Sequence, residues 1–340
     1  MYESFYALTG KPFQLNPDPA FYFGSRGHKR AFAYLQYGVH QSEGFIVNTG
    51  DVGAGKTTIV RSLFEQLDSG RLVAAQLVST HLEADDMLRA VTTAFGLPTK
   101  NVDKATLLAS LEAFLCQLVV AGKRALLVVD EAQNLTPRAI EELRMLSNFQ
   151  FADQALLQSF LIGQPELRAM MQSPQMQQLR QRVIASYHLG PMDRDETQAY
   201  VEHRLTHVGW KGDPAFDPAT FAIIHSLSRG VPRRINMLCN RLMLSGFLAE
   251  KHAFNEADVQ AIAREITEEL GPEASMAGMP SAARAANGPD DADVAGIRGN
   301  LREIEDRIDR LEKTVGAAVD LLHRLLHRDR VTKPGTPANR

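Results

Sequence analysis

A glycine-rich run with one lysine and two threonines is the part of this sequence best suited to chemistry. The run is Gly50-Asp51-Val52-Gly53-Ala54-Gly55-Lys56-Thr57, continued by Thr58, and it fits the pattern G-x-x-x-x-G-K-[ST]. Glycines let backbone N–H groups turn inward around phosphate oxygens, while Lys56 can reach the β- and γ-phosphates and the Thr57 hydroxyl can ligate Mg²⁺. The run therefore predicts a site for ATP with Mg²⁺.

Two acidic residues follow an apolar run further along the chain. Asp130 and Glu131 come directly after Leu126-Leu127-Val128-Val129. A carboxylate at a strand end can hold Mg²⁺, directly or through water, and we assign this role to Asp130. Glu131 is then placed to polarise an attacking water. The plainer alternative is an acidic cap on a strand end.

Four further polar residues are candidates for the same chemistry. Gln164 follows the predicted strand Ser159-Phe160-Leu161-Ile162-Gly163 and could orient the water or sense the γ-phosphate. Arg180 and Arg182 close a predicted helix just before the last strand, where they could reach the nucleotide of a neighbouring subunit. Arg233 follows Pro232, which suits a first helical turn, and could face the phosphates across a cleft. The alternatives are a polar loop residue for Gln164 and solvated surface side chains for Arg180 and Arg182.

Alternating apolar runs and amphipathic stretches predict the elements that carry these residues. Strands are expected at 45–48, 72–78, 125–129, 157–162 and 186–189, with helices at 56–68, 84–95, 104–121, 136–149 and 165–183. Such alternation predicts an α/β domain, here 44–191, with a parallel sheet covered by helices on both faces.

The segments on either side of this domain have a different pattern. Beyond Met192 the strand signal stops, and helices at 193–208, 217–228, 231–250 and 255–269 predict a small all-helical domain over 192–270. Residues 1–43 begin with an arm rich in aromatic residues and proline and end in a helix at 28–41. We expect this segment to pack on the α/β core.

The end of the chain predicts assembly. Residues 271–296 are small, polar and broken by proline, as in a flexible linker. Residues 297–327 then carry apolar residues at alternating spacings of four and three, which is typical of a coiled coil, and 328–340 read as a disordered tail. A homo-oligomer is the expected result, although an amphipathic helix docked on the protein's own core is the alternative.

Composition excludes several classes of protein. The formal net charge of -3 gives no global reason to bind nucleic acid, so nucleic acid is not an expected partner. The two cysteines, Cys116 and Cys239, exclude a disulfide framework and a Cys-based zinc site. No apolar run is long enough to span a membrane and no signal peptide is visible, so we expect a cytoplasmic protein that reaches the membrane through a partner.

Together the motifs resemble those of AAA+ P-loop ATPases. In that comparison 50–57 is the Walker A motif, 126–131 is Walker B, Gln164 is sensor 1, and 230–233 contains sensor 2 at Arg233. Arg180 and Arg182 occupy the place of the arginine finger. The resemblance covers residues 1–269 and implies the sheet order 5-1-4-3-2. It also implies a nucleotide between the sheet and a helical lid, with the segment near His28 beside the adenine.

A narrower resemblance is to the secretion ATPases of the ExeA/GspA type. It rests on Phe5-Tyr6-Ala7-Leu8, Pro12-Phe13, Asn16-Pro17-Asp18-Pro19, the run 50–58, Asp130-Glu131-Ala132-Gln133-Asn134-Leu135 and Gly163-Gln164-Pro165-Glu166-Leu167. Within that type, 23–30 and 179–191 are similar to the ATPase associated with the exosortase/PEP-CTERM system, a subgroup linked to exopolysaccharide export. The resemblance implies partners among envelope secretion or polysaccharide-export components.

Three functions compete at this point. The first is an ATP-hydrolysing motor or switch for an envelope assembly. The second is an AAA+ DNA-associated regulator of the transposition or replication type. The third is a scaffold gated by nucleotide without hydrolysis, which the intact pair of Asp130 and Glu131 disfavours.

Overall fold

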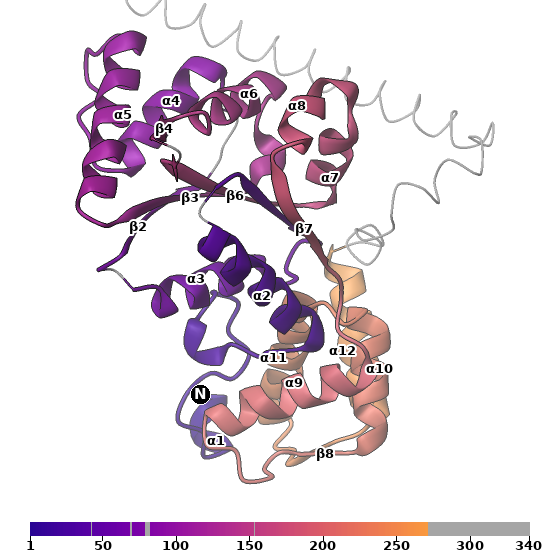
Figure 1. Cartoon of the computed structure of the whole chain (residues 1–340). Helices are drawn as coiled ribbons and strands as arrows, with labels where there is room; N and C mark the ends of the chain where they lie inside the picture. Colours follow the sequence, from indigo (N-terminus) through magenta and orange to yellow (C-terminus); the bar gives the residue numbers. More distant parts are fainter. Residues whose placement is uncertain (42, 69, 79–81, 153, 271–340) are drawn as a thin grey trace, which may run out of the picture. The chain divides into compact units, whose positions relative to one another are not determined.

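A five-stranded parallel sheet forms the centre of the α/β part of the chain (Figure 1). The structure, a computed structural model, describes residues 1–270 except 42, 69, 79–81 and 153. The strands are β1 (Phe45–Gly50), β2 (Leu72–Val78), β3 (Arg124–Asp130), β6 (Leu157–Gly163) and β7 (Val183–Leu189). They lie in the order β2-β3-β6-β1-β7. Counted along the chain, this is the expected order 5-1-4-3-2, and the predicted α/β fold is confirmed.

Helices cover both faces of this sheet because the central strands are apolar on both sides. In β3, Leu127 and Val129 face one buried cluster, and Leu126 and Val128 face another. The first cluster is closed by α4 (Ala84–Ala94), α5 (Lys104–Val120), α6 (Pro137–Leu146) and α7 (Pro165–Gln172). The second is closed by α2 (Arg26–Gln41) and α3 (Lys56–Gln66), which lie on the other face of the sheet in Figure 1.

The helix predicted over 165–183 is wrong as a single element. Helix α7 ends at Gln172, a 3₁₀ turn follows at Pro174–Met176, α8 covers Gln177–Arg180, and β7 already begins at Val183. The cause is Pro174, because proline lacks an N–H and restricts the residue before it. Ser173 accordingly has extended backbone angles, φ −62° and ψ 152°.

Four helices build the part after the sheet: α9 (Arg194–His207), α10 (Pro218–Ser228), α11 (Pro232–Leu248) and α12 (Glu256–Leu270). Polar side chains cap the starts of α9, α10 and α12. Asp193 forms a capping box with Glu196, and Asn255 and Asp258 accept each other's backbone N–H. The expectation of no strand here is wrong by one short pair, since β8 (Ala215–Phe216) runs parallel to β9 (Ala253–Phe254).

The N-terminal segment divides between the two parts of the fold. It contains α1 (Tyr2–Phe5) and a 3₁₀ turn at Pro19–Phe21, and its aromatic side chains lie in the cluster made by α9 to α12. The Arg204 Nε of α9 donates to the carbonyl of Pro12, and the Tyr6 hydroxyl donates to the carbonyl of Lys251. Helix α2 packs on the sheet, and Tyr22 lies against the same cluster. The Arg61 guanidinium of α3 donates to the carbonyl of Pro17. The expected packing of 1–43 on the α/β core therefore holds for α2 and for the stretch around the 3₁₀ turn.

Some expectations fall outside these residues. The predicted linker at 271–296, coiled coil at 297–327 and tail at 328–340 all lie beyond the described part of the chain.

Two short strands that were not expected, β4 (Gln150–Phe151) and β5 (Gln154–Ala155), form a hairpin before β6. Across the residues that the structure describes, no helix is both long and apolar enough to cross a membrane.

Candidate nucleotide-binding site

The loop between β1 and α3 has a backbone that only glycine adopts easily. Gly53 has φ 80° and Gly55 has φ 98°, both in the left-handed region. Neighbouring groups also leave no room for side chains here. A Cβ on Gly53 would lie 2.3 Å from the Arg233 Cβ, and one on Gly55 would lie 2.7 Å from the His28 Nε2. The glycines of the predicted phosphate loop are therefore required by conformation and by contact.

Lys56 is the first residue of α3 and its ammonium lies inside this loop. The Nζ donates to the carbonyls of Gly50 at 2.6 Å and Asp51 at 2.9 Å. Burial lowers the pKa of Lys56, while the carboxylates of Glu131, Asp130 and Asp51 act in the opposite direction. The side chain is only 6% exposed, so the loop holds a cation at a helix N-terminus, which suits an anionic ligand.

Thr57 and Asp130 meet across the gap between α3 and β3. The Thr57 hydroxyl donates to the Asp130 Oδ2 at 3.1 Å, and burial raises the pKa of Asp130. Mg²⁺ prefers oxygen ligands and is usually held by one or two protein groups together with phosphates and water. The described residues contain no group of three or more His, Cys, Asp or Glu that could hold a metal ion. The pair fits Mg²⁺ that arrives with a nucleotide.

Glu131 is positioned by two side-chain amides. Its carboxylate accepts from the Gln133 Nε2 at 2.6 Å and from the Gln164 Nε2 at 3.1 Å. Burial acts to raise the pKa of Glu131, but these two donors and the charge of Lys56 together hold it below its usual value. The carboxylate is therefore ionised, and the two amides hold it where β3 and β6 end.

The sequence motifs assign no role to Gln133. Its side-chain carbonyl accepts the backbone N–H of Gln164 at 2.9 Å, so it joins the ends of β3 and β6. A Cβ on Gly163 would lie 2.8 Å from that same oxygen, which explains the glycine at this position. The only available signal was the presence of an amide two residues after Glu131.

Arg233 belongs to α11 and touches the phosphate loop from the helical part of the chain. Its backbone N–H donates to the carbonyl of Gly53 at 3.2 Å. The guanidinium is exposed and makes no hydrogen bond or ion pair with other residues in the described part of the chain. Gly230 makes the entry to α11 possible, since a Cβ there would lie 1.9 Å from the Met192 carbonyl oxygen.

Arg180 and Arg182 are not at this site. Arg180 donates to the carbonyls of Met171 and Ser173, and Arg182 donates to Ser147. The Arg182 carbonyl accepts the N–H of Phe45, which places it at the start of β1, whereas the phosphate loop follows the end of that strand. A strand of six residues is about 20 Å long, so neither side chain reaches the loop of its own chain.

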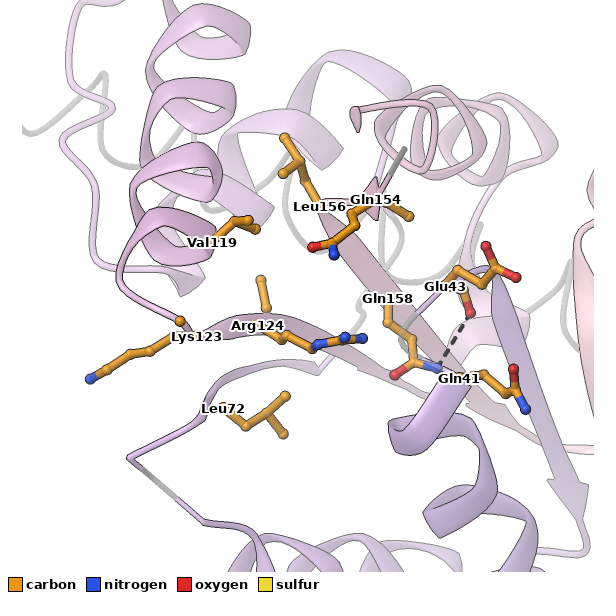
Figure 2. A pocket seen from close by; sticks show the side chains of 12 residues that line it. Gln41, Glu43, Leu72, Val119, Lys123, Arg124, Gln154, Leu156 and Gln158 are labelled. Atoms are coloured by element: carbon orange, nitrogen blue, oxygen red, sulfur yellow. Dashed lines mark hydrogen bonds between the residues drawn. The ribbon is translucent and has the colours of Figure 1, made fainter. Parts of the chain in front are cut away.

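A cavity of about 310 Å³ lies where the strands begin, whereas the phosphate loop lies where they end (Figure 2). It is lined at the starts of β2, β3 and β6 by Leu72, Arg124 and Gln158. The Gln158 side chain donates to the carbonyls of Gly38 and Glu43. This cavity contains none of the residues predicted to do chemistry.

Comparison with known proteins identifies the α/β part. Residues 39–171 match the family described as an AAA domain. Among curated proteins, it is 38% identical over 268 residues to the general secretion pathway protein A of Aeromonas hydrophila. That match covers 78% of this chain and 49% of the relative, so the chain spans about half of the relative's length.

Solved structures support the same fold. The Aeropyrum pernix ORC2 protein in its ADP form matches with a TM-score of 0.54 at 17% identity, covering 75% of each chain. The Cdc6p protein of Pyrobaculum aerophilum matches with a TM-score of 0.54 at 15% identity, covering 82% of this chain and 74% of that one. At these identities the likeness is one of fold alone.

Proposed function

We propose that this chain binds ATP with Mg²⁺ and hydrolyses it. The observation that carries the proposal is that Lys56, Glu131 and the hydrogen-bonded pair of Thr57 and Asp130 lie together where the strands end. Bound Mg²⁺ would supply charge neutralisation at the phosphate oxygens. Lys56 and the loop N–H groups hold the β- and γ-phosphates, with Gly50, Asp51, Val52, Ala54 and Thr58 contributing the rest of the loop.

In the proposed reaction Glu131 accepts a proton from the attacking water. Its pKa, held below the usual value, keeps it ionised and able to do so. Gln164, hydrogen-bonded to Glu131, orients the water, and Arg233 approaches the phosphates from α11. Arg180 or Arg182 acts on the nucleotide of a neighbouring subunit, because neither reaches its own loop.

We further propose that hydrolysis serves an envelope secretion assembly as a motor or switch. The support is the 38% identity to the general secretion pathway protein A, which extends past the AAA domain over 268 residues. The similarity of 23–30 and 179–191 to exosortase-associated ATPases makes exopolysaccharide export the proposed process. The chain would then act on the cytoplasmic side of the inner membrane through a partner.

The DNA-associated alternative gains no support from the fold. The matching origin-recognition structures are 15–17% identical, and the net charge of the chain is -3. Salt-dependent retention of this chain on DNA would nevertheless revive it.

Steady-state phosphate release by the full chain with Mg²⁺ and ATP tests the enzymatic proposal. We expect turnover by the parent protein and none by Lys56→Ala, because the loop then loses the cation aimed at the phosphates. Equal ATP affinity in Lys56→Ala and the parent would refute the assignment of the loop. Binding without turnover in the parent would instead favour the nucleotide-gated scaffold.

A further inference from the structure

The His28 side chain, in the first turn of α2, lies against the phosphate loop. Its Nε2 is 3.0 Å from the carbonyl oxygen of Ala54, and its Nδ1 is 2.7 Å from the hydroxyl of Ser25. The residue is 6% exposed. A histidine 26 residues away in sequence thus makes a buried polar contact with the backbone of the loop.

These partners fix which nitrogen of the His28 ring carries the hydrogen. A carbonyl oxygen can only accept, so the Nε2 must carry the hydrogen and donate to Ala54. In the neutral ring the Nδ1 is then an acceptor, and the Ser25 hydroxyl donates to it. Burial lowers the pKa of His28, which keeps the ring neutral at physiological pH.

The direction of this hydrogen bond matters for anion binding. The peptide between Ala54 and Gly55 is planar and trans, so its C=O and N–H point to opposite sides. When His28 holds the carbonyl, the N–H of Gly55 is turned away from the ring. A phosphate site needs N–H groups directed inward, whereas an inward carbonyl would repel phosphate oxygens. Gly55 lacks a Cβ, and one there would lie 2.7 Å from the His28 Nε2.

The helix that carries His28 is well anchored. Ala31 and Leu35, on the same side of α2, are each 1% exposed and lie in the cluster under the sheet. The backbone N–H of Arg26 donates to the Glu196 Oε1 at 2.7 Å, and its guanidinium pairs with Glu196 and Asp193. Arg26 is 79% exposed, so these ion pairs add little stability. The buried anchors therefore position the histidine.

We propose that His28 is a positioning residue for the phosphate loop, which it holds in the form that binds phosphate by donating from its Nε2 to the carbonyl of Ala54. What the loop binds rests on the proposed function. The role differs from the expected place of this segment beside the adenine, because the contact is with loop backbone. It would make α2 part of the nucleotide site.

Two amide substitutions separate this role from simple packing. In His28→Gln the Nε2 is as many bonds from the Cβ as in histidine, so it can still donate to Ala54. In His28→Asn the amide reaches only as far as the histidine Nδ1 and can meet Ser25 but not Ala54. Tyr37→Asn, at a position 49% exposed on the same helix, is the control for helix propensity.

The first measurement is the affinity for a fluorescent ribose-labelled ATP with Mg²⁺. We expect His28→Asn to bind about tenfold more weakly than the parent, and His28→Gln to stay within about threefold. Ser25→Ala, which frees the ring to change tautomer, should lie between them. Equal losses in the Gln and Asn variants, or no loss in either, would overturn the proposal.

The second measurement needs no nucleotide. Hydrogen–deuterium exchange of the backbone at 50–57 should rise in His28→Asn and stay at the parent level in His28→Gln and Tyr37→Asn. Unchanged exchange in His28→Asn would overturn the proposal even if nucleotide affinity fell. A parent that fails to bind the labelled ATP, with exchange rising in His28→Asn, would refute the proposed function and leave the role of His28 standing.

Discussion

The position of the Glu131 carboxylate depends on side chains from two strand ends. Its carboxylate is directed by the amides of Gln133 and Gln164, which come from the ends of two neighbouring strands. The backbone of Glu131 is itself left-handed, with φ 54°, so the chain turns sharply directly after β3. That turn brings Gln133 back to the carboxylate.

Glu131→Gln should keep nucleotide binding and stop turnover. The amide is almost the same size and can still form hydrogen bonds, but it cannot accept a proton from water. Loss of an oriented acid–base group lowers rates by about 10²- to 10⁴-fold. Phosphate release and labelled-ATP affinity measured on the same preparation check this. Turnover within a few-fold of the parent would reduce Glu131 to a cap on β3.

Gln133→Leu should lower the turnover number by about tenfold while the affinity for ATP with Mg²⁺ stays within about twofold. The substitution removes the donor to Glu131 and the acceptor for the N–H of Gln164, but touches neither Lys56 nor Thr57. Gln172→Leu, at the exposed end of α7, is the matched control. A loss of affinity as large as the loss of turnover would assign Gln133 to the fold of the site rather than to the water.

At this scale the sequence predicts the residues whose chemistry is carried by a local motif. Lys56, Thr57, Asp130 and Glu131 stand in short patterns with strand or helix signals beside them, and the structure brings all four together. Gln133 and His28 could not be found in this way. Each contacts a backbone group far away in sequence, 31 residues for Gln133 and 26 for His28, and only folding brings these groups together.

Secondary-structure elements are likewise predictable from the sequence where they have a long apolar pattern, and not where they are short. The sheet is predictable because its central strands are buried on both faces, and in β3 this gives an uninterrupted apolar run from Ala125 to Val129. Short elements such as β8 and β9, two residues each, have no periodicity to detect. The prediction of one helix over 165–183 is wrong for another reason, because the apolar pattern continues across a proline that ends the helix.

The contacts of α9 allow a comparison of a buried and an exposed arginine. Arg204, 6% exposed, donates to Pro12 and to the Tyr200 hydroxyl, whereas Arg26, 79% exposed, forms surface ion pairs. Arg204→Leu leaves buried acceptors without a donor and should lower the free energy of unfolding by about 2–3 kcal/mol. Arg26→Ala should change it by less than about 1 kcal/mol. Denaturant unfolding of both variants measures the difference, and equal effects would contradict it.

At the scale of the whole molecule, we propose that Arg180 or Arg182 acts between the subunits of a homo-oligomer, because Arg182 lies at the start of β1 and the phosphate loop follows the end of that strand. Mixing Arg182→Ala subunits with Glu131→Gln subunits should restore part of the ATPase activity. The reason is that some interfaces then pair an intact Glu131 with an intact Arg182. Phosphate release across a series of mixing ratios measures this, with assembly followed by light scattering. No recovery of activity at any ratio, in mixtures that do assemble, would contradict a role of Arg182 between subunits. The same experiment with Arg180→Ala distinguishes the two candidates.

The C-terminal heptad pattern at 297–325 predicts assembly that does not depend on nucleotide. The pattern predicts an apolar seam that a single helix in water could not bury. We expect 271–296 to act as a linker long enough to leave the packing of the ATPase parts unconstrained. The helix would therefore raise the local concentration of subunits. Truncation after Leu270 should leave ATP affinity intact but make ATPase activity depend more steeply on protein concentration, and Ile304→Asp with Leu311→Asp should have the same effect. Sedimentation of the isolated segment checks its self-association. A monomeric segment, together with an unchanged concentration dependence after truncation, would show that the seam instead receives a helix of a partner protein.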